Sequence, residues 1–135
     1  MTRRVPARLP PRSRPPNSRS RARVGSSRIR PTILIVAEMA GELAGFVLAY
    51  RLPRLDGEAA QLFVYELGVT SQYWHGGIGT SLMGYVRELV DEESLMEAFV
   101  LADQRNDAAV RLYPSTGGHV EGAGNVLFVY PGHVA

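Results

Sequence analysis

The chain of 135 residues contains no cysteine and no lysine. Without cysteine, disulfides, cysteine-ligated zinc sites and a cysteine nucleophile are all excluded. No apolar run approaches the ~20 residues of a membrane span, and no secretory signal with an apolar centre is visible. The length is enough for one domain with a real core and short for two. We therefore expect a single-domain cytoplasmic protein.

Positive charge is carried by Arg alone and is distributed unevenly. Ten of the 15 Arg lie in the first 30 residues, which contain no acidic residue. From Pro31 onward five Arg face 13 Asp and Glu, a net charge of −8 that the overall value of +2 conceals. A body of this charge favours a cationic ligand.

Residues 1–31 combine ten Arg with six Pro and offer almost no apolar face. This composition predicts a disordered arm, followed by a folded domain over residues 32–135. An arginine-rich arm suits nucleic-acid binding, but it lacks interleaved aromatics for stacking. It also suits a transit peptide, but the prolines oppose the amphipathic helix that such a peptide needs. We favour a third interpretation, a translated stretch that is not a natural part of the fold.

The most informative stretch reads as a strand, a glycine loop and a helix. Leu62 to Val69 alternates aromatic and β-branched residues with a lone carboxylate, Glu66, as expected for a strand. Three glycines follow within four residues, and then apolar residues recur at helical spacing from Ile78 to Val90. A helix entered through glycines leaves its first N–H groups free to bind a phosphate.

The remaining patterns predict a mixed fold of the α/β (α+β) class. Two β-rich runs around Gly41 predict an antiparallel hairpin, and a fourth strand after the helix completes a βαβ crossover. A short helix begins at Asn106 or Asp107 and ends at Tyr113, because Pro114 follows. The expected strands, in order, are 33–37, 44–51, 62–69 and 96–101, with closing strands at 119–121 and 126–130 around a turn at 122–125.

The order strand, Gly-Gly-Ile-Gly-Thr, helix, strand, then Asn106 and Leu112-Tyr113 resembles the GCN5-related N-acetyltransferase (GNAT) superfamily. The segments YELGV, GGIGTSLM and LADQRNDAAVRLY are similar to the small aminoglycoside 3-N-acetyltransferases, a class linked to antibiotic resistance. The resemblance covers Ile33 to Tyr130. It implies a GNAT-like, mostly antiparallel sheet with a central βαβ crossover. The first strand and helices of such enzymes have no expected counterpart in residues 1–31.

The resemblance also implies a binding site for acetyl-coenzyme A. The diphosphate of the cofactor would lie on the glycine loop, and the pantetheine arm of the cofactor would bond the backbone of Leu67 and Val69. Asn106 matches a position that contacts the pantetheine or caps the last helix. The loop departs from the family pattern, because Trp74 stands at the usual Gln or Arg position and His75 where a second Arg is common. The expected loop residues are Trp74, His75, Gly76, Gly77, Ile78, Gly79 and Thr80.

Four acidic or phenolic side chains are candidates for the chemistry. Glu66 matches a family acid that deprotonates the amine directly or through water, and Tyr113 matches the tyrosine that protonates the departing thiolate. Asp103 and Asp107 fall where the aminoglycoside enzymes carry acids that face a polycation. The three His residues have no ligand spacing, so no metal site is expected.

These features predict an N-acetyltransferase that moves acetyl from acetyl-coenzyme A to a small cationic amine, with an aminoglycoside among the candidates. The alternative is a truncated, catalytically silent domain that at most binds coenzyme A. A nucleic-acid-binding arm is a third and weaker hypothesis. A homodimer is also an option, because an exposed sheet edge seeks a partner.

Overall fold

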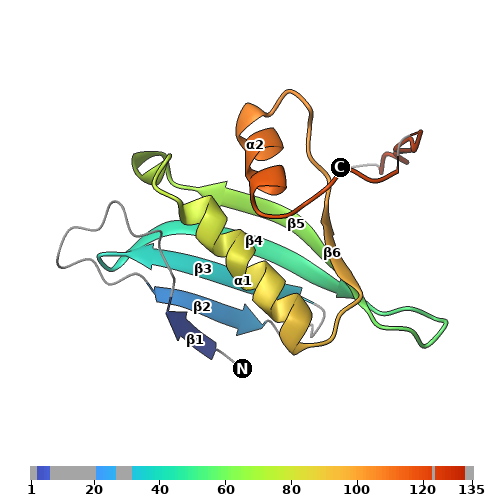
Figure 1. Cartoon of the computed structure of the whole chain (residues 1–135), viewed down its shortest axis with the longest axis horizontal. Helices are drawn as coiled ribbons and strands as arrows, with labels where there is room; N and C mark the ends of the chain where they lie inside the picture. The colour runs from blue at the N-terminus through green and yellow to red at the C-terminus, as the bar shows by residue number, and fades with distance from the viewer. Residues whose placement is uncertain (1–2, 7–20, 27–31, 123, 133–135) are drawn as a thin grey trace.

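The computed structural model describes residues 3–6, 21–26, 32–122 and 124–132. Six strands form one sheet in the order of the chain, and a helix lies across one face of it (Figure 1). All neighbouring strands are antiparallel except the last pair, which is parallel. The elements are β1 (Arg3–Pro6), β2 (Arg21–Ser26), β3 (Thr32–Met39), β4 (Glu42–Leu52), β5 (Gln61–Val69), the 3-10 turn η1 (Ser71–Tyr73), α1 (Ile78–Glu92), β6 (Glu97–Val100) and α2 (Asp107–Ser115).

The hairpin of β3 and β4 forms as the sequence predicts. Ala40 and Gly41 make its turn with φ of 50° and 82°, and only glycine adopts the second value without strain. One face of the hairpin is buried beneath α1. That face is made of alternate residues, which is the period-2 pattern of a half-buried sheet: Ile33, Ile35 and Ala37 from β3, with Val47 and Ala49 from β4.

Helix α1 completes the core by burying the apolar stripe that the sequence predicts. Ile78, Leu82 and Val86 lie at i, i+4 and i+8 and are at most 3% exposed. The helix sits close to the sheet because Gly45 has no side chain. A Cβ there would lie 2.7 Å from the Gly68 carbonyl oxygen and 3.0 Å from Cγ2 of Ile78.

The expected βαβ crossover is present, since β5, α1 and β6 follow one another and β5 pairs with β6 in parallel. A bidentate ion pair ties the far end of α1 to the sheet. Nε and Nη2 of Arg51 donate to the two carboxylate oxygens of Glu93 at 2.9 and 2.7 Å. No helix within the described ranges is long and apolar enough to cross a membrane.

The prediction of a disordered arm is wrong for two of its segments. Arg3–Pro6 and Arg21–Ser26 form β1 and β2, and β2 pairs with β3 along six residues. Without such pairing the N–H and C=O groups on that edge of β3 would have no strand partner, and backbone pairing needs no apolar side chain. Residues 1–2, 7–20 and 27–31 of the arm lie outside the described residues. The described residues before β3 contain no helix.

Two expectations at the C-terminal end are also wrong. Helix α2 continues through Pro114 to Ser115, because amides beyond the proline bond the carbonyls before it: Thr116 N–H donates to Leu112 at 3.1 Å and Gly118 N–H to Tyr113 at 2.9 Å. The closing strands do not form, although the Gly122–Asn125 turn does, with an N–H···O bond of 2.8 Å. Residues 126–130 find no strand to pair with in the described chain and remain exposed.

Candidate active site

The site begins where β5 and β6 separate. The parallel pairing runs from Gln61 with Glu97 to Val64 with Val100 and ends there, whereas β5 continues to Val69. At the same point β5 has an extra residue, because Leu48 of β4 pairs with Glu66 and Ala49 with Val64. Tyr65 is therefore bulged out of the register. A bulge bends and twists its strand, which accounts for the opening between the two strands.

A pocket of about 310 Å³ occupies this opening. The second half of β5 forms one wall, the segment after β6 forms another, and α2 closes the end; α2 lies beside β5 in Figure 1, away from the middle of α1. Its lining residues are Phe46, Tyr65, Glu66, Leu67, Val100, Leu101, Ala102, Asp103, Asn106, Ala109 and Tyr113.

Five of the residues singled out from the sequence meet in this pocket: Glu66, Leu67, Asp103, Asn106 and Tyr113. The others lie beyond it. Val69 ends β5, Trp74 to Thr80 form the turn and the start of α1, and Asp107 occupies the first turn of α2. In that turn the carboxylate of Asp107 suits the positive end of the helix dipole without any ligand.

About half of the residues that line the pocket were not predicted from the sequence. Tyr65 was assigned only to a strand face, and the bulge that turns it toward the opening leaves no mark in the alternation of residues. Leu101 and Ala102 belong to the LADQR segment that carries the resemblance, so that segment was the available signal. Phe46 of β4 had no signal, because its role depends on the pairing of β4 with β5.

The open edge of β5 presents backbone groups to the pocket side. The N–H of Thr70 donates to the Ala44 carbonyl at 2.8 Å. Because bonding directions alternate along an antiparallel strand, Gly68 also faces β4, and Leu67 and Val69 face away from it. The indole Nε1–H of Trp74 already donates to the Val69 carbonyl at 2.8 Å. The N–H of Val69 and both backbone groups of Leu67 remain for a ligand.

The glycine loop delivers an uncapped helix N-terminus. Gly77 is the N-cap, with φ of 82° and no side-chain capping bond, and the first helical bond runs from Ser81 N–H to the Gly77 carbonyl at 3.0 Å. The N–H groups of the three preceding residues therefore have no partner inside the helix. Such a terminus, with the positive end of the helix dipole, fits a phosphate. Gly79 has a packing role as well, since a Cβ there would lie 3.2 Å from Cδ2 of Leu112 in α2.

Trp74 and His75 are the two loop residues that the sequence predicts to depart from the family pattern. Trp74 is 62% exposed, and its bond to Val69 fixes the indole over the end of β5. His75 is exposed and adopts φ of 62°, in the left-handed region. Neither side chain supplies a guanidinium to a diphosphate, so backbone N–H groups are the donors that the loop offers.

Tyr113 and Glu66 bring acid–base chemistry to the pocket. Tyr113 is half-buried between α2 and β5, and burial raises the pKa of its phenol above the ordinary value of about 10. Its hydroxyl is therefore protonated at neutral pH and available as a donor. Glu66 is exposed and lies on the opposite wall, on β5.

Asp103 and Asn106 shape the end of the pocket next to α2. The guanidinium of Arg105 pairs with the Asp103 carboxylate at 2.9 Å, and together with the Arg105 backbone N–H it holds the pKa of that carboxyl below its usual range. The side-chain oxygen of Asn106 accepts from Ala109 N–H at 3.1 Å and so caps α2. Across the described ranges, no three His, Asp or Glu side chains gather as metal ligands would.

The fold is shared with several acetyltransferases of known structure. The aminoglycoside acetyltransferase HMB0005, from an uncultured soil metagenomic sample, is 27% identical with a TM-score of 0.70, over 78% of this chain and 69% of that one. The aminoglycoside acetyltransferase meta-AAC0020, also from an uncultured soil metagenomic sample, is 25% identical with a TM-score of 0.70, over 78% of this chain and 68% of that one. At 15% identity, aminoglycoside N-acetyltransferase AAC(6')-Iy in complex with CoA shares the fold, with a TM-score of 0.65 over 77% of this chain and 69% of that one.

A comparison with curated proteins gives no match. The family comparison is decisive, because residues 5–117 match the Acetyltransferase (GNAT) family, well over half of the chain. That range contains the bulged strand β5, the glycine loop and Tyr113. The chain therefore belongs to the Acetyltransferase (GNAT) family, whose acetyl donor is acetyl-coenzyme A.

Proposed function

We propose that the chain transfers acetyl from acetyl-coenzyme A directly to a small cationic amine. The observation that carries the proposal is the opening between β5 and β6, which brings a free backbone edge, a carboxylate and a protonated tyrosine to one pocket. The capless N-terminus of α1 follows the same strand and offers its N–H groups to the diphosphate.

Each catalytic task has a candidate in this chain. When bound, acetyl-coenzyme A supplies an activated acetyl group as a thioester. Glu66 accepts a proton from the ammonium, directly or through water, and so leaves a neutral amine as the nucleophile. A backbone N–H on β5 polarises the thioester carbonyl. As the C–N bond forms and the C–S bond breaks, Tyr113 donates its proton to the leaving sulfur, and the second proton lost by the nitrogen returns through water to the Tyr113 phenolate.

Charge supports a cationic acceptor. The chain from Pro31 onward has a net charge of −8, and Glu66 and Asp103 lie on the pocket wall. Asp103 is paired with Arg105, so a polycationic amine would compete with that guanidinium for the carboxylate. The likeness to two aminoglycoside acetyltransferases at 25% and 27% identity makes aminoglycosides the first acceptors to try.

The test is acetyl transfer to a panel of amines, and it is measured as the release of the free thiol of coenzyme A. The panel contains aminoglycosides, linear polyamines and neutral amino sugars at matched concentration. We expect faster thiol release with the polycations than with the neutral sugars. Thiol release that no amine accelerates above the background hydrolysis would contradict the proposal.

A second candidate function is binding of coenzyme A without transfer. It is favoured by Trp74, which stands at the usual Gln or Arg position and already occupies the Val69 carbonyl. In that case coenzyme A raises the melting temperature. At 100 times its dissociation constant it adds about 2.7 kcal/mol to the free energy of unfolding. The same protein would acetylate none of the amines.

A further inference from the structure

Tyr65 stands at the exposed end of a cluster of four aromatic rings. Its ring centroid lies 5.7 Å from that of Tyr50 and 5.9 Å from that of Phe63, and both pairs meet edge to face. Phe63 in turn stacks on Phe99, with centroids 4.9 Å apart. Contacts of this kind stabilise a defined orientation of the ring. Tyr65 nevertheless remains 56% exposed, so much of its surface is open to a ligand.

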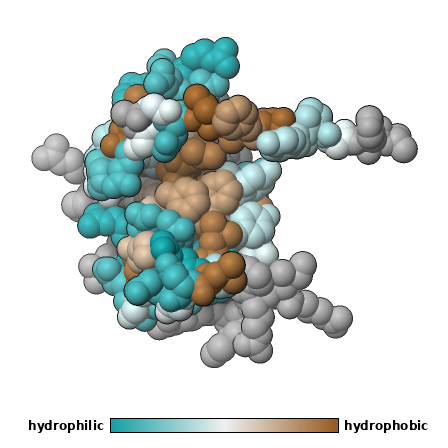
Figure 2. Space-filling view, turned by 90° about the vertical axis from the view of Figure 1, so that its right-hand side faces the viewer, coloured by the Kyte–Doolittle hydropathy of each residue, from teal (hydrophilic) through white to brown (hydrophobic). Residues whose placement is uncertain are grey.

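The cluster lies on the face of the sheet opposite α1. Leu62 and Val64 are at most 1% exposed and belong to the core that α1 covers. Because neighbours along a strand point to opposite faces, Phe63 between them points away from α1. Its cross-strand partners are Tyr50 in β4 and Phe99 in β6. Apolar side chains gather at the surface on the side of the molecule where β6 lies (Figure 2).

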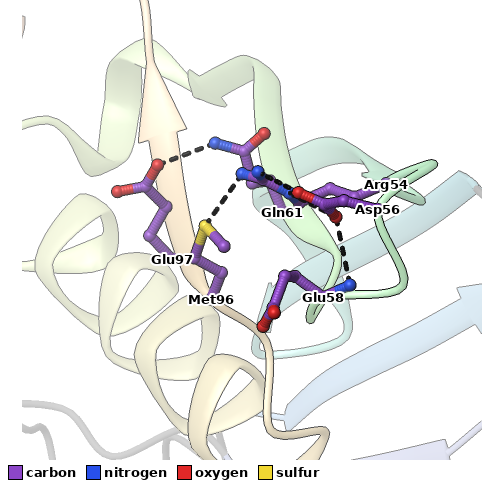
Figure 3. A network of polar contacts seen from close by, with 6 residues as sticks. All are labelled: Arg54, Asp56, Glu58, Gln61, Met96 and Glu97. Carbon is purple, nitrogen blue, oxygen red and sulfur yellow. Dashed lines mark hydrogen bonds and ion pairs between the residues drawn. The ribbon is translucent and has the colours of Figure 1, made fainter.

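Two polar contacts hold the strands that carry the cluster. Gln61 Nε2 donates to a carboxylate oxygen of Glu97 at 2.7 Å and so joins the first residues of β5 and β6 (Figure 3). Arg54 Nη1 contacts the sulfur of Met96, just before β6, at 3.4 Å (Figure 3). These contacts fix β6 against β5, so the rings that support Tyr65 are preorganised for a ligand.

The bulge brings a ring and a carboxylate to the same pocket. Consecutive residues of a regular strand point to opposite faces, yet Tyr65 and Glu66 both line the pocket. A bulge re-aims a side chain in this way. Of the two carboxylates in the pocket wall, that of Asp103 is paired with Arg105. The Glu66 side chain has no hydrogen bond or ion pair with another residue of the described ranges, so its charge is free to attract a cation.

We propose that the Tyr65 ring binds a second ammonium group of the acceptor, beside the amine that Glu66 deprotonates. The π face of a tyrosine attracts a cation that lies within about 6 Å of the ring centroid. Because the ring and the carboxylate belong to adjacent residues, the two groups suit nitrogens a few bonds apart in one ligand. Tyr65 then selects di- and polyamines over monoamines. This role rests on the proposed function, because only an acceptor of acetyl presents an amine to Glu66.

The first experiment measures cation binding without turnover. Tetramethylammonium has no N–H bond and cannot be acetylated, and the NMR shift of its methyl protons follows its binding to the full chain. An aromatic face shields these protons, so we expect an upfield shift. The dissociation constant should rise about threefold or more in Tyr65→Leu and stay within about twofold in Tyr65→Phe, which keeps the ring. Equal affinity of the wild type and Tyr65→Leu would overturn the proposal.

Matched controls separate the subsite from a general effect. Tyr130→Leu removes a tyrosine that is 91% exposed and lies outside the pocket, so it should bind tetramethylammonium as the wild type does. The neutral tert-butanol has a similar shape and should show no difference between the wild type and Tyr65→Leu. If Tyr65→Leu does not melt cooperatively, Tyr65→Trp decides, because an indole attracts a cation more strongly than a phenol. A Tyr65→Trp chain that binds no more tightly than the wild type would then contradict the proposal.

The second experiment measures acetyl transfer to two acceptors, the fastest polycation of the amine panel and the monoamine butylamine. In the wild type the polycation should have the lower KM. Tyr65→Leu should raise that KM by about three- to thirtyfold and change the KM of butylamine and of acetyl-coenzyme A by less than about twofold. An equal rise for both amines would rule out contact with a second ammonium. If the wild type acetylates no amine, the proposed function fails, whereas tetramethylammonium still decides whether Tyr65 binds cations.

Discussion

The indole N–H of Trp74 is bonded to the backbone carbonyl of Val69 at 2.8 Å. The sequence resemblance predicts that Trp74 stands where family members usually carry Gln or Arg. The bond uses an acceptor on the open edge of β5 and holds a neutral ring at the end of that strand.

Trp74→Arg should tighten the binding of coenzyme A. The change frees the Val69 carbonyl and brings a guanidinium next to the diphosphate, and a charge-assisted bond contributes about 1.5–3 kcal/mol. We expect the dissociation constant to fall at least tenfold at low salt, measured by titration calorimetry. Trp74→Leu is the control that frees the carbonyl without adding charge. Equal affinity of the Arg and Leu variants would show that the diphosphate does not lie near this position.

Tyr113→Phe should lower kcat by about 10²–10⁴-fold, the usual contribution of a positioned acid. The ring remains in the pocket, so the dissociation constant of acetyl-coenzyme A should stay within about twofold, since the phenol is not needed to hold the ligand. Single-turnover rates and equilibrium binding measured on the same preparations separate the two effects. An unchanged rate would remove Tyr113 from the mechanism.

The pH profile should show no loss of rate from Tyr113 between pH 7 and about 9, because burial raises the pKa of its phenol above about 10. The same raised pKa of Tyr113 makes the free energy of unfolding depend on pH. The Tyr113 phenol loses its proton at a lower pH in the unfolded chain than in the folded chain. Its contribution to the free energy of unfolding is therefore complete below the ordinary pKa and is lost as pH rises through the pKa of the folded state. Ultraviolet absorbance of ionised tyrosine, compared between wild type and Tyr113→Phe, measures the shift. A tyrosine that titrates below pH 10 and is absent from the variant would contradict it.

Two glycine-to-alanine changes should act in opposite directions. Gly45→Ala places a Cβ 2.7 Å from the Gly68 carbonyl oxygen, so it must push α1 or β5 away and destabilise the fold by about 1–3 kcal/mol. Gly84→Ala lies on the exposed side of α1 with open space around it and should stabilise by about 0.5–1 kcal/mol. Urea unfolding of both variants measures the difference. The packing of α1 on the sheet would need revision if Gly45→Ala were neutral.

The sequence predicts the helices and strands whose apolar residues follow a simple period. It does not predict features that depend on the pairing of one strand with another. The buried stripe of α1 and the hairpin around Gly41 are visible because spacing and turn chemistry are local. The bulge at Tyr65 is invisible because it is a relation between β4 and β5. The segment at Arg21–Ser26 was expected to be disordered from composition, yet it pairs with β3, since backbone bonds do not require an apolar side chain.

The residues of the candidate site also divide into those that short motifs predict and those whose place depends on the fold. Glu66, Asn106 and Tyr113 were found through short motifs, and the structure places them on one pocket. Asp107 came from the same motif, but it lies in the first turn of α2 and is not among the residues that line this pocket. Trp74 was recognised as a departure, and its partner was not, because the Val69 carbonyl belongs to the strand before the turn.

The order of strands in the sheet equals their order along the chain. The β3–β4 and β4–β5 pairs close over short loops that cost little loop entropy, whereas the β5–β6 pair closes through the crossover helix α1. The pocket is different, since its walls join Phe46 to Tyr113 across half of the chain. The pocket is therefore complete only when α2 has docked, so the binding of a ligand that needs all of its walls would report that docking.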